Sequence, residues 1–343
     1  MFENRDDYFA NYIEEDKAGK AQFLWVSLFY FMAKVCMDEY GTEGEKVIRQ
    51  AVRDLGKERA VRKRQRSDGM GMEPNLVSMT KVIDLYGEPR FSFGKQISEA
   101  TPEEKIIKVY TCPNCNIWAR LEGKKSGDYL KIGSIYCEEV HHYLYGKYDP
   151  AIQVNLCEIL TKGDPLCNFR LNMREANKSA YAVPVYEPQS WEDYGTDVTG
   201  SIYTVFCLNY FHYGKAVYDT LGKNTLRNGL KAFGKCRGER IRELNRRKGQ
   251  ENTIENLLEQ GDLLLDDREK PEIEKASDGE YRIHFRRNIM KEVLTSHRAE
   301  ELLDIYYEEA FSALAAAYNN RLKTEITELP QKTGYEMKIR VEE

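Results

Sequence analysis

The stretch GEKVIRQAVRDLGKERAVRKR, residues 44–64, decides the fold because the chain repeats its pattern later. Residues 222–242 read GKNTLRNGLKAFGKCRGERIR, and their glycine and basic positions coincide with the first stretch at a constant spacing of 178 residues (222 minus 44). Residues 136–171 and 306–341 coincide without a gap at a spacing of 170 residues (306 minus 136). Two matching stretches in the same order predict a tandem duplication.

Each copy predicts the same order of elements: helix, helix, strand, helix and closing hairpin. The expected elements of the first copy are an apolar helix at 23–40, a long amphipathic helix through 44–64, a strand at 105–111, a helix at 128–144 and strands at 152–160 and 166–172. The expected elements of the second copy include helices at 203–218 and 298–317 and a strand at 280–285. The order makes neighbouring strands antiparallel, so the predicted class is α+β with helices on one face of the sheet.

The length also indicates two domains, since cores usually stop growing at about 250 to 300 residues. The first copy, 1–175, is predicted to be a hydrolase-like domain that carries the chemistry-bearing cysteines and histidines. Residues 176–198, with Pro184 and Pro188, are predicted to form a linker because they break both periodicities. Residues 199–343 are predicted to be a degenerate second copy that serves as scaffold.

Charge and hydropathy exclude several classes of partner. The chain has 51 basic and 56 acidic residues, so no global field attracts nucleic acid or anionic lipid. The basic runs at 59–66 and 240–248 are interpreted as solvated helix ends. The longest apolar run, 23–33, is short of the roughly 18 to 20 residues that span a bilayer. The acidic start MFENRDDYFANYIEED lacks signal-peptide features, which predicts a cytoplasmic protein without nucleic-acid or membrane partners.

Eight cysteines without a signal peptide are expected to be thiols or metal ligands. Five of them fall in one stretch of the first copy: Cys112, Cys115, Cys137, Cys157 and Cys167. Cys36, Cys207 and Cys236 are scattered and are interpreted as small apolar fillers. At the equivalent positions of the second copy the reactive residues are replaced, with Tyr307, Phe311, Ser312 and Met337 standing for Cys137, His141, His142 and Cys167.

Three interpretations of this stretch stay open. In the first, Cys137 supplies a thiolate, and His141, one helical turn later, or the neighbouring His142 activates it. In the second, three or four side chains bind a metal, most simply zinc. The ligands would come from Cys112, Cys115, Cys137, His141 and Cys167. In the third, the residues are ordinary buried thiols and solvated histidines.

The first half, from about Phe23 to Leu171, resembles the L-2-amino-thiazoline-4-carboxylic acid hydrolase family. The resemblance rests on Gly56 in the long helix, Cys112-Pro113 after a strand, Tyr136-Cys137, Tyr148-Asp149-Pro150 and the closing GDPLCNF at 163–169. The closing motif is also similar to the end of 4-vinyl reductase domains, which are small-molecule and metal-binding modules. One departure is His141, where the family favours an aspartate.

The resemblance implies hydrolytic opening of a thiazoline ring to an N-carbamoyl cysteine. Cys137 is the preferred nucleophile and His141 the general acid and base, with His142 and Asp164 completing the catalytic set. Cys112, Trp118, Tyr148 and Asp149 are expected to bind the substrate. The alternative function is a small-molecule sensor or carrier with zinc on Cys112, Cys115, Cys137 and Cys167. The hydrolase would require no cofactor, take a small-molecule substrate and act as a monomer or weak homo-oligomer.

Overall fold

The computed structural model describes residues 13–14, 16–82, 95–123, 130–173, 197–329 and 334–342. The chain forms two compact units. The first unit takes its described residues from 45–173. The second unit joins residues 13–44 to the described residues from 197 onward.

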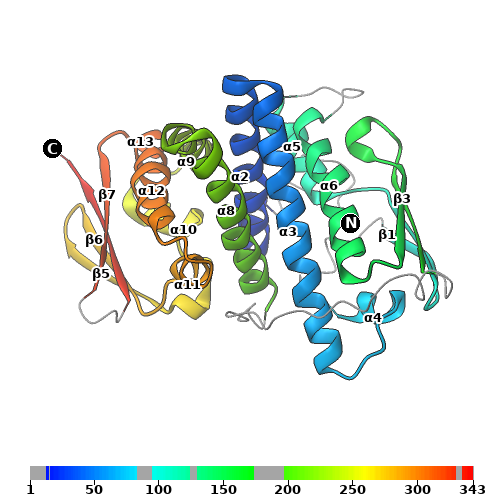
Figure 1. Ribbon diagram of the computed structural model, residues 1–343. Helices are drawn as coiled ribbons and strands as arrows, with labels where there is room; N and C mark the ends of the chain where they lie inside the picture. The colour runs from blue at the N-terminus through cyan, green and yellow to red at the C-terminus, as the bar shows by residue number, and fades with distance from the viewer. Residues whose placement is uncertain are drawn as a thin grey trace. The chain divides into compact units, whose positions relative to one another are not determined.

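The first unit consists of a four-stranded sheet with helices to one side of it (Figure 1). Its sheet has the order β1-β2-β4-β3, and every neighbouring pair is antiparallel. In chain order the elements are α3 (Thr42–Gly69), α4 (Leu76–Lys81), β1 (Lys95–Ala100), β2 (Glu104–Val109), α5 (Pro113–Leu121), α6 (Lys131–Tyr148), β3 (Ile152–Glu158) and β4 (Cys167–Met173).

The second unit contains a sheet with the equivalent strand order, β5-β6-β8-β7, again antiparallel throughout. Its helices are α2 (Lys17–Tyr40), α8 (Val198–Leu221), α9 (Lys223–Lys248), α10 (Ile254–Gln260), α11 (Ile289–Ser296), α12 (Glu301–Tyr306) and α13 (Ser312–Tyr318). A π-helical turn, Tyr307–Phe311, joins the last two helices. The strands are β5 (Pro271–Ser277), β6 (Glu280–Phe285), β7 (Leu322–Glu328) and β8 (Tyr335–Val341).

The α+β class and the antiparallel pairing are confirmed. Each sheet also holds an edge strand that the sequence pattern did not predict, β1 in the first unit and β5 in the second. The strand β5, PEIEKAS, is mostly exposed and carries the charges of Glu272, Glu274 and Lys275, as is typical of an edge strand that must not pair with another chain. Such a strand lacks the apolar alternation on which the prediction relied.

The two units repeat one helix-packing contact at equivalent positions of the sequence repeat. A Cβ added to Gly56 on α3 would lie 2.9 Å from the carbonyl oxygen of Val140 on α6. A Cβ added to Gly234 on α9 would lie 2.1 Å from the carbonyl oxygen of Ala310. Glycine is required at both positions because the two helix backbones meet there. This shared contact supports the inference of a tandem duplication.

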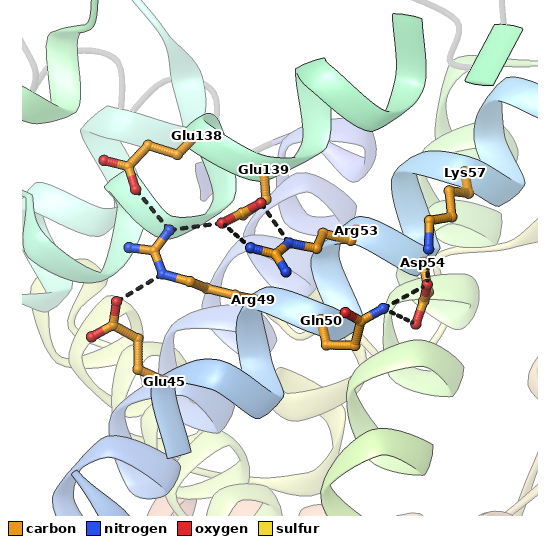
Figure 2. Close-up of polar contacts among 8 residues, drawn as sticks. All are labelled: Glu45, Arg49, Gln50, Arg53, Asp54, Lys57, Glu138 and Glu139. Carbon is orange, nitrogen blue, oxygen red and sulfur yellow. Dashed lines mark hydrogen bonds and ion pairs between the residues drawn. The ribbon is translucent and has the colours of Figure 1, made fainter. Parts of the chain in front are cut away.

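A network of ion pairs recurs in the same way. Arg49 of α3 lies 2.7 Å from a carboxylate oxygen of Glu138 and 3.0 Å from one of Glu139, both on α6 (Figure 2). Arg53 adds a 2.8 Å contact to Glu139. In the second unit Arg227 lies 3.0 Å from Glu309, the residue equivalent to Glu139. Each unit therefore ties its long helix to its central helix through the same charges.

Helix α2 packs within the second unit, against α8 and α9. The rings of Phe29 and Tyr213 are 5.5 Å apart, and Thr225 donates a 2.9 Å hydrogen bond to Glu39. The compact units therefore divide the chain differently from the predicted domains 1–175 and 199–343, which follow the sequence repeat. Of the predicted linker, residues 176–196 lie outside the described residues.

The apolar run at 23–33 forms the buried middle of α2. Among the helices of the described residues, none combines the length and the apolar character needed to cross a membrane.

Candidate active site

Four thiols of the first unit converge where α5, α6 and β4 meet. The Cys115 side chain is within hydrogen-bonding reach of the thiols of Cys112 and Cys137. Cys167, at the start of β4, lies close enough for charge on Cys137 or Cys112 to influence its pKa. Cys157, on β3, is exposed. The structure thus brings together four of the five cysteines that the sequence singled out.

The start of α5 positions the first thiol. Cys112 is the N-cap residue, with extended backbone angles of φ −127° and ψ 125°, and Pro113 occupies the first turn, where a missing N–H is harmless. The Cys112 side chain makes no capping hydrogen bond to the helix. The thiol nevertheless lies beside the N–H groups of Asn114 and Cys115. A sulfur at this position faces the positive end of the helix dipole.

These neighbours shift the pKa values of the thiols in different directions. The Cys115 thiol, acting as donor, lowers the pKa of Cys112 against the opposing effect of burial, and the backbone N–H groups of Cys115 and Asn114 lower it further. The same interaction with Cys112, together with Cys137 and burial, raises the pKa of Cys115 well above its ordinary value. Burial also raises the pKa of Cys167. Cys112 is therefore the thiol that the site favours as thiolate.

His141 does not carry the charge that the sequence interpretation assumed. Its ring packs edge-on against Phe169 of β4, with centroids 4.7 Å apart. Burial, followed by the positive charge of Arg59, lowers the pKa of His141 to about 3. His141 is therefore uncharged at neutral pH and offers Cys137 no imidazolium partner. The buried Nδ1 of His141 has no hydrogen-bond partner in the described structure.

Of the other predicted substrate-binding and catalytic residues, two are packing residues. Trp118 is fully buried on α5, and a Cβ on Gly133 of α6 would lie 2.4 Å from its ring. Tyr148 is also fully buried, with its hydroxyl 2.9 Å from that of Ser67. These contacts hold helices together. His142, one position after His141, faces outward and is exposed.

The two aspartates of the predicted site stabilise turns. Asp149, at the end of α6, accepts a 2.8 Å hydrogen bond from the backbone N–H of Ala151 and lies 3.7 Å from Arg64. Asp164 accepts a 2.7 Å hydrogen bond from the backbone N–H of Ile159. Gly163, beside it, has φ +93°, a left-handed conformation that glycine adopts without strain. The two carboxylates therefore shape the turns at either end of β3.

Arg59 is a residue of this region that sequence reasoning did not assign to the site. It lies on α3, its guanidinium is 3.4 Å from the Tyr136 hydroxyl, and its charge reaches His141. The signal was present, because Arg59 and Arg237 coincide in the repeat. The sequence interpretation treats it only as part of a basic helix end. In the structure it brings a positive charge to the site.

A metal was the alternative use of these thiols. Within the part of the chain that the structure describes, no group of three or more His, Cys, Asp or Glu side chains is placed to hold a metal ion. The described geometry therefore gives the zinc alternative no support.

The segment that carries the thiols matches a family model. Residues 21–171 match the model of the L-2-amino-thiazoline-4-carboxylic acid hydrolase family. The family is named for a hydrolase, and its match covers α2 through the thiol cluster to β4. Comparisons with curated proteins and with solved structures found no match.

The second unit has a different polar cluster at the position equivalent to the family-matched thiols. Asn288, the N-cap of α11, takes the place of Cys112, and its amide donates a 2.6 Å hydrogen bond to the hydroxyl of Tyr307. Tyr307 takes the place of Cys137 and begins the π-helical turn. The second copy thus has an amide–phenol hydrogen bond at the helix junction where the first copy has thiols.

A buried carboxyl, Glu269, completes this cluster. It is 4% exposed, accepts a 2.9 Å hydrogen bond from the backbone N–H of Ile289 and a 3.2 Å bond from the hydroxyl of Tyr335. Burial, with Asp266 adding to it, raises the pKa of Glu269 to about 8. The other ionisable groups that face it are Tyr203 and Cys207 of α8, Tyr307, Tyr335 and Arg268.

We expect Glu269 to make stability fall as the pH rises. The folded protein holds the proton up to about pH 8, whereas an unfolded glutamate loses it near its ordinary pKa of 4.5. The stability that the protonated carboxyl contributes is fully present below the unfolded pKa. It is lost as the pH rises to the folded pKa, at up to about 1.4 kcal/mol per pH unit. Denaturant unfolding of wild type and Glu269→Gln between pH 5 and 8.5 measures this. Parallel pH profiles for the two proteins would contradict the expectation.

Proposed function

We propose that the first half hydrolyses a small cyclic amidine of the amino-thiazoline type through a cysteine thiolate. The observation that carries the proposal is the Cys112 thiol at the start of α5, in contact with Cys115 and inside the segment that matches the hydrolase family. The thiolate is the reactive form of cysteine, and a helix N-terminus stabilises it. C2 of an amino-thiazoline is an amidine-like carbon that a thiolate can attack.

We assign the attack to Cys112 and not to Cys137, the nucleophile that the sequence favoured. Cys112 is partly exposed, whereas Cys137 is buried within α6. The neighbours of Cys112 stabilise its charged form, while the predicted activator of Cys137, His141, is neutral. Access and charge therefore favour the same sulfur.

The reaction follows in two steps. The Cys112 thiolate forms a bond to C2, the bond from C2 to the ring sulfur breaks, and that sulfur leaves as a thiolate that takes up a proton. The intermediate is an isothiourea that joins the Cys112 sulfur to the opened substrate. Water then adds to the same carbon, the Cys112 thiolate leaves, and the product is an N-carbamoyl cysteine.

Two further side chains have roles in this proposal. The unpaired Nδ1 of His141 can accept a hydrogen bond from the attacking water, which a neutral imidazole does and an imidazolium does not. Arg59 supplies the positive charge that a ring carboxylate requires, and its planar guanidinium suits carboxylate recognition. The residues thus match a substrate that is both an amidine and an acid.

The test is a hydrolysis assay on the full chain under reducing conditions with a chelator present. The expected result with 2-amino-thiazoline-4-carboxylate is release of one free thiol per molecule hydrolysed, with a mass gain of one water. A matched compound that lacks the ring carboxylate should react more slowly, because Arg59 then has no anion to bind. Absence of thiol release from every cyclic amidine tested would overturn the proposal.

A further inference from the structure

The pair Cys112 and Cys115 has features that the hydrolysis does not use. Residues three apart at a helix start have Cβ atoms about 5 to 6 Å apart, and small side-chain rotations bring their sulfurs within reach of one another. Here the two side chains already interact. Cys112 is partly exposed and Cys115 is only 4% exposed. Cys112 is therefore the more accessible residue of the pair.

We propose that Cys112 and Cys115 form a reversible disulfide by exchange with a small disulfide, with Cys112 as the attacking sulfur. The sequence Cys-Pro-Asn-Cys spans the junction between the end of β2 and the first turn of α5. Such a dithiol combines an accessible thiolate at a helix N-terminus with a protected resolving thiol. The lowered pKa of Cys112 and the raised pKa of Cys115 support this division of roles.

The exchange balances in two steps. The Cys112 thiol loses its proton to solvent, and its sulfur attacks one sulfur of a small disulfide, RSSR. The first RS⁻ leaves and a mixed disulfide remains. Cys115 then attacks the Cys112 sulfur, and the second RS⁻ leaves with the Cys115 proton. The protein loses two electrons and two hydrogens, and the small disulfide is reduced to two thiols.

Cys137 is the competing partner, because Cys115 also contacts it. Cys137 lies inside α6 and is buried, as is Cys115. Neither of these two can make the first attack on a disulfide in solution as readily as Cys112. The exposed Cys157 is accessible but lies apart on β3. The geometry therefore selects the Cys112–Cys115 pair.

The disulfide would also stop the proposed hydrolysis, since Cys112 could no longer act as nucleophile. This consequence rests on the proposed function, whereas the disulfide itself does not. The experiment therefore measures the bond directly by mass and follows activity separately.

The full chain is equilibrated with chelator in graded ratios of reduced to oxidised glutathione, quenched with acid, alkylated and digested with trypsin. Residues 109–120 form one peptide, VYTCPNCNIWAR, which contains both cysteines. The expected result is that this peptide loses both alkyl labels together and becomes lighter by two hydrogens as the ratio becomes oxidising. Cys115→Ser should instead trap a glutathione adduct on Cys112. Cys157→Ser, the matched control, should leave the behaviour of the peptide unchanged.

Three results would overturn the proposal: full labelling of the peptide at the most oxidising ratio, a crosslink between this peptide and residues 132–147, or stoichiometric zinc retained against the chelator. The mass measurement on the wild-type protein tests the disulfide even if a variant fails to fold. Activity lost on oxidation and restored by dithiothreitol would link the disulfide to hydrolysis. A reduced protein with the disulfide chemistry but no hydrolysis would count against the proposed function alone.

Discussion

Replacing Cys112 by serine is expected to lower turnover of a thiazoline substrate by at least about a thousandfold, because a hydroxyl at this site is far less acidic and nucleophilic than a thiol. Its neighbours can stabilise a thiolate but cannot ionise a serine at neutral pH. Steady-state kinetics with 2-amino-thiazoline-4-carboxylate measure the loss. We expect it in kcat, since the substitution removes the attack itself and leaves the substrate contacts in place.

Two matched variants make this result specific. Cys157→Ser changes an exposed thiol on the same sheet and should keep wild-type kinetics. Cys137→Ser changes a buried thiol of the cluster and should retain more activity than Cys112→Ser. The reverse order of the two cluster variants would return the nucleophile to Cys137, as the sequence suggested. Near-wild-type turnover in both would remove cysteine catalysis altogether.

Replacing Asp262 by alanine is expected to destabilise the second unit by about 3 to 5 kcal/mol, the usual cost of leaving one partner of a buried ion pair without the other. The Arg237 and Asp262 side chains are 1% and 0% exposed, and their closest atoms are 2.6 Å apart. Burial alone would raise the pKa of Asp262, but Arg237 outweighs it and holds that pKa below its ordinary value. Guanidinium unfolding measures the loss as a lower midpoint.

The surface of the same helix provides the control. Glu243 and Arg246 of α9 form a solvent-exposed pair, and Glu243→Ala should leave the midpoint unchanged. The double change Arg237→Met with Asp262→Leu should recover much of the lost stability, since a well-packed apolar pair can replace a buried ion pair. An Asp262→Ala protein with the wild-type midpoint would show that the pair contributes nothing.

Sequence periodicity was sufficient for the elements that bury one strongly apolar face. The helix predicted at 23–40 is α2, and the strands predicted at 152–160 and 166–172 are β3 and β4. Prediction from periodicity failed where tertiary packing, and not the sequence pattern, determines the local structure. The helix predicted at 298–317 is split into α12, a π-helical turn and α13, and nothing in the letters of that turn distinguishes it from an ordinary helix.

The sequence could name the residues of the candidate site but not their protonation states. The sequence left open whether the thiols of the first copy form a site or are ordinary buried residues, and in the structure four of them lie close together. Their protonation depends on tertiary neighbours. His141 is neutral because Phe169 and the surrounding core bury it, and the pKa of Cys112 is lowered first by the Cys115 thiol and then by the backbone N–H groups at the start of α5. Neither effect can be predicted from the spacing of two residues in the sequence.

The membership of α2 in the second compact unit has a consequence for how the chain folds. Helix α2 is made before the helices that cover it, α8 and α9, which lie beyond residue 197. The buried residues Phe23, Leu24 and Phe29 must therefore stay uncovered while the whole first unit emerges from the ribosome. Such an exposed apolar helix is a target for chaperones and a site for association between nascent chains. A fragment that ended near residue 175 would hold the family-matched segment and still carry this uncovered face.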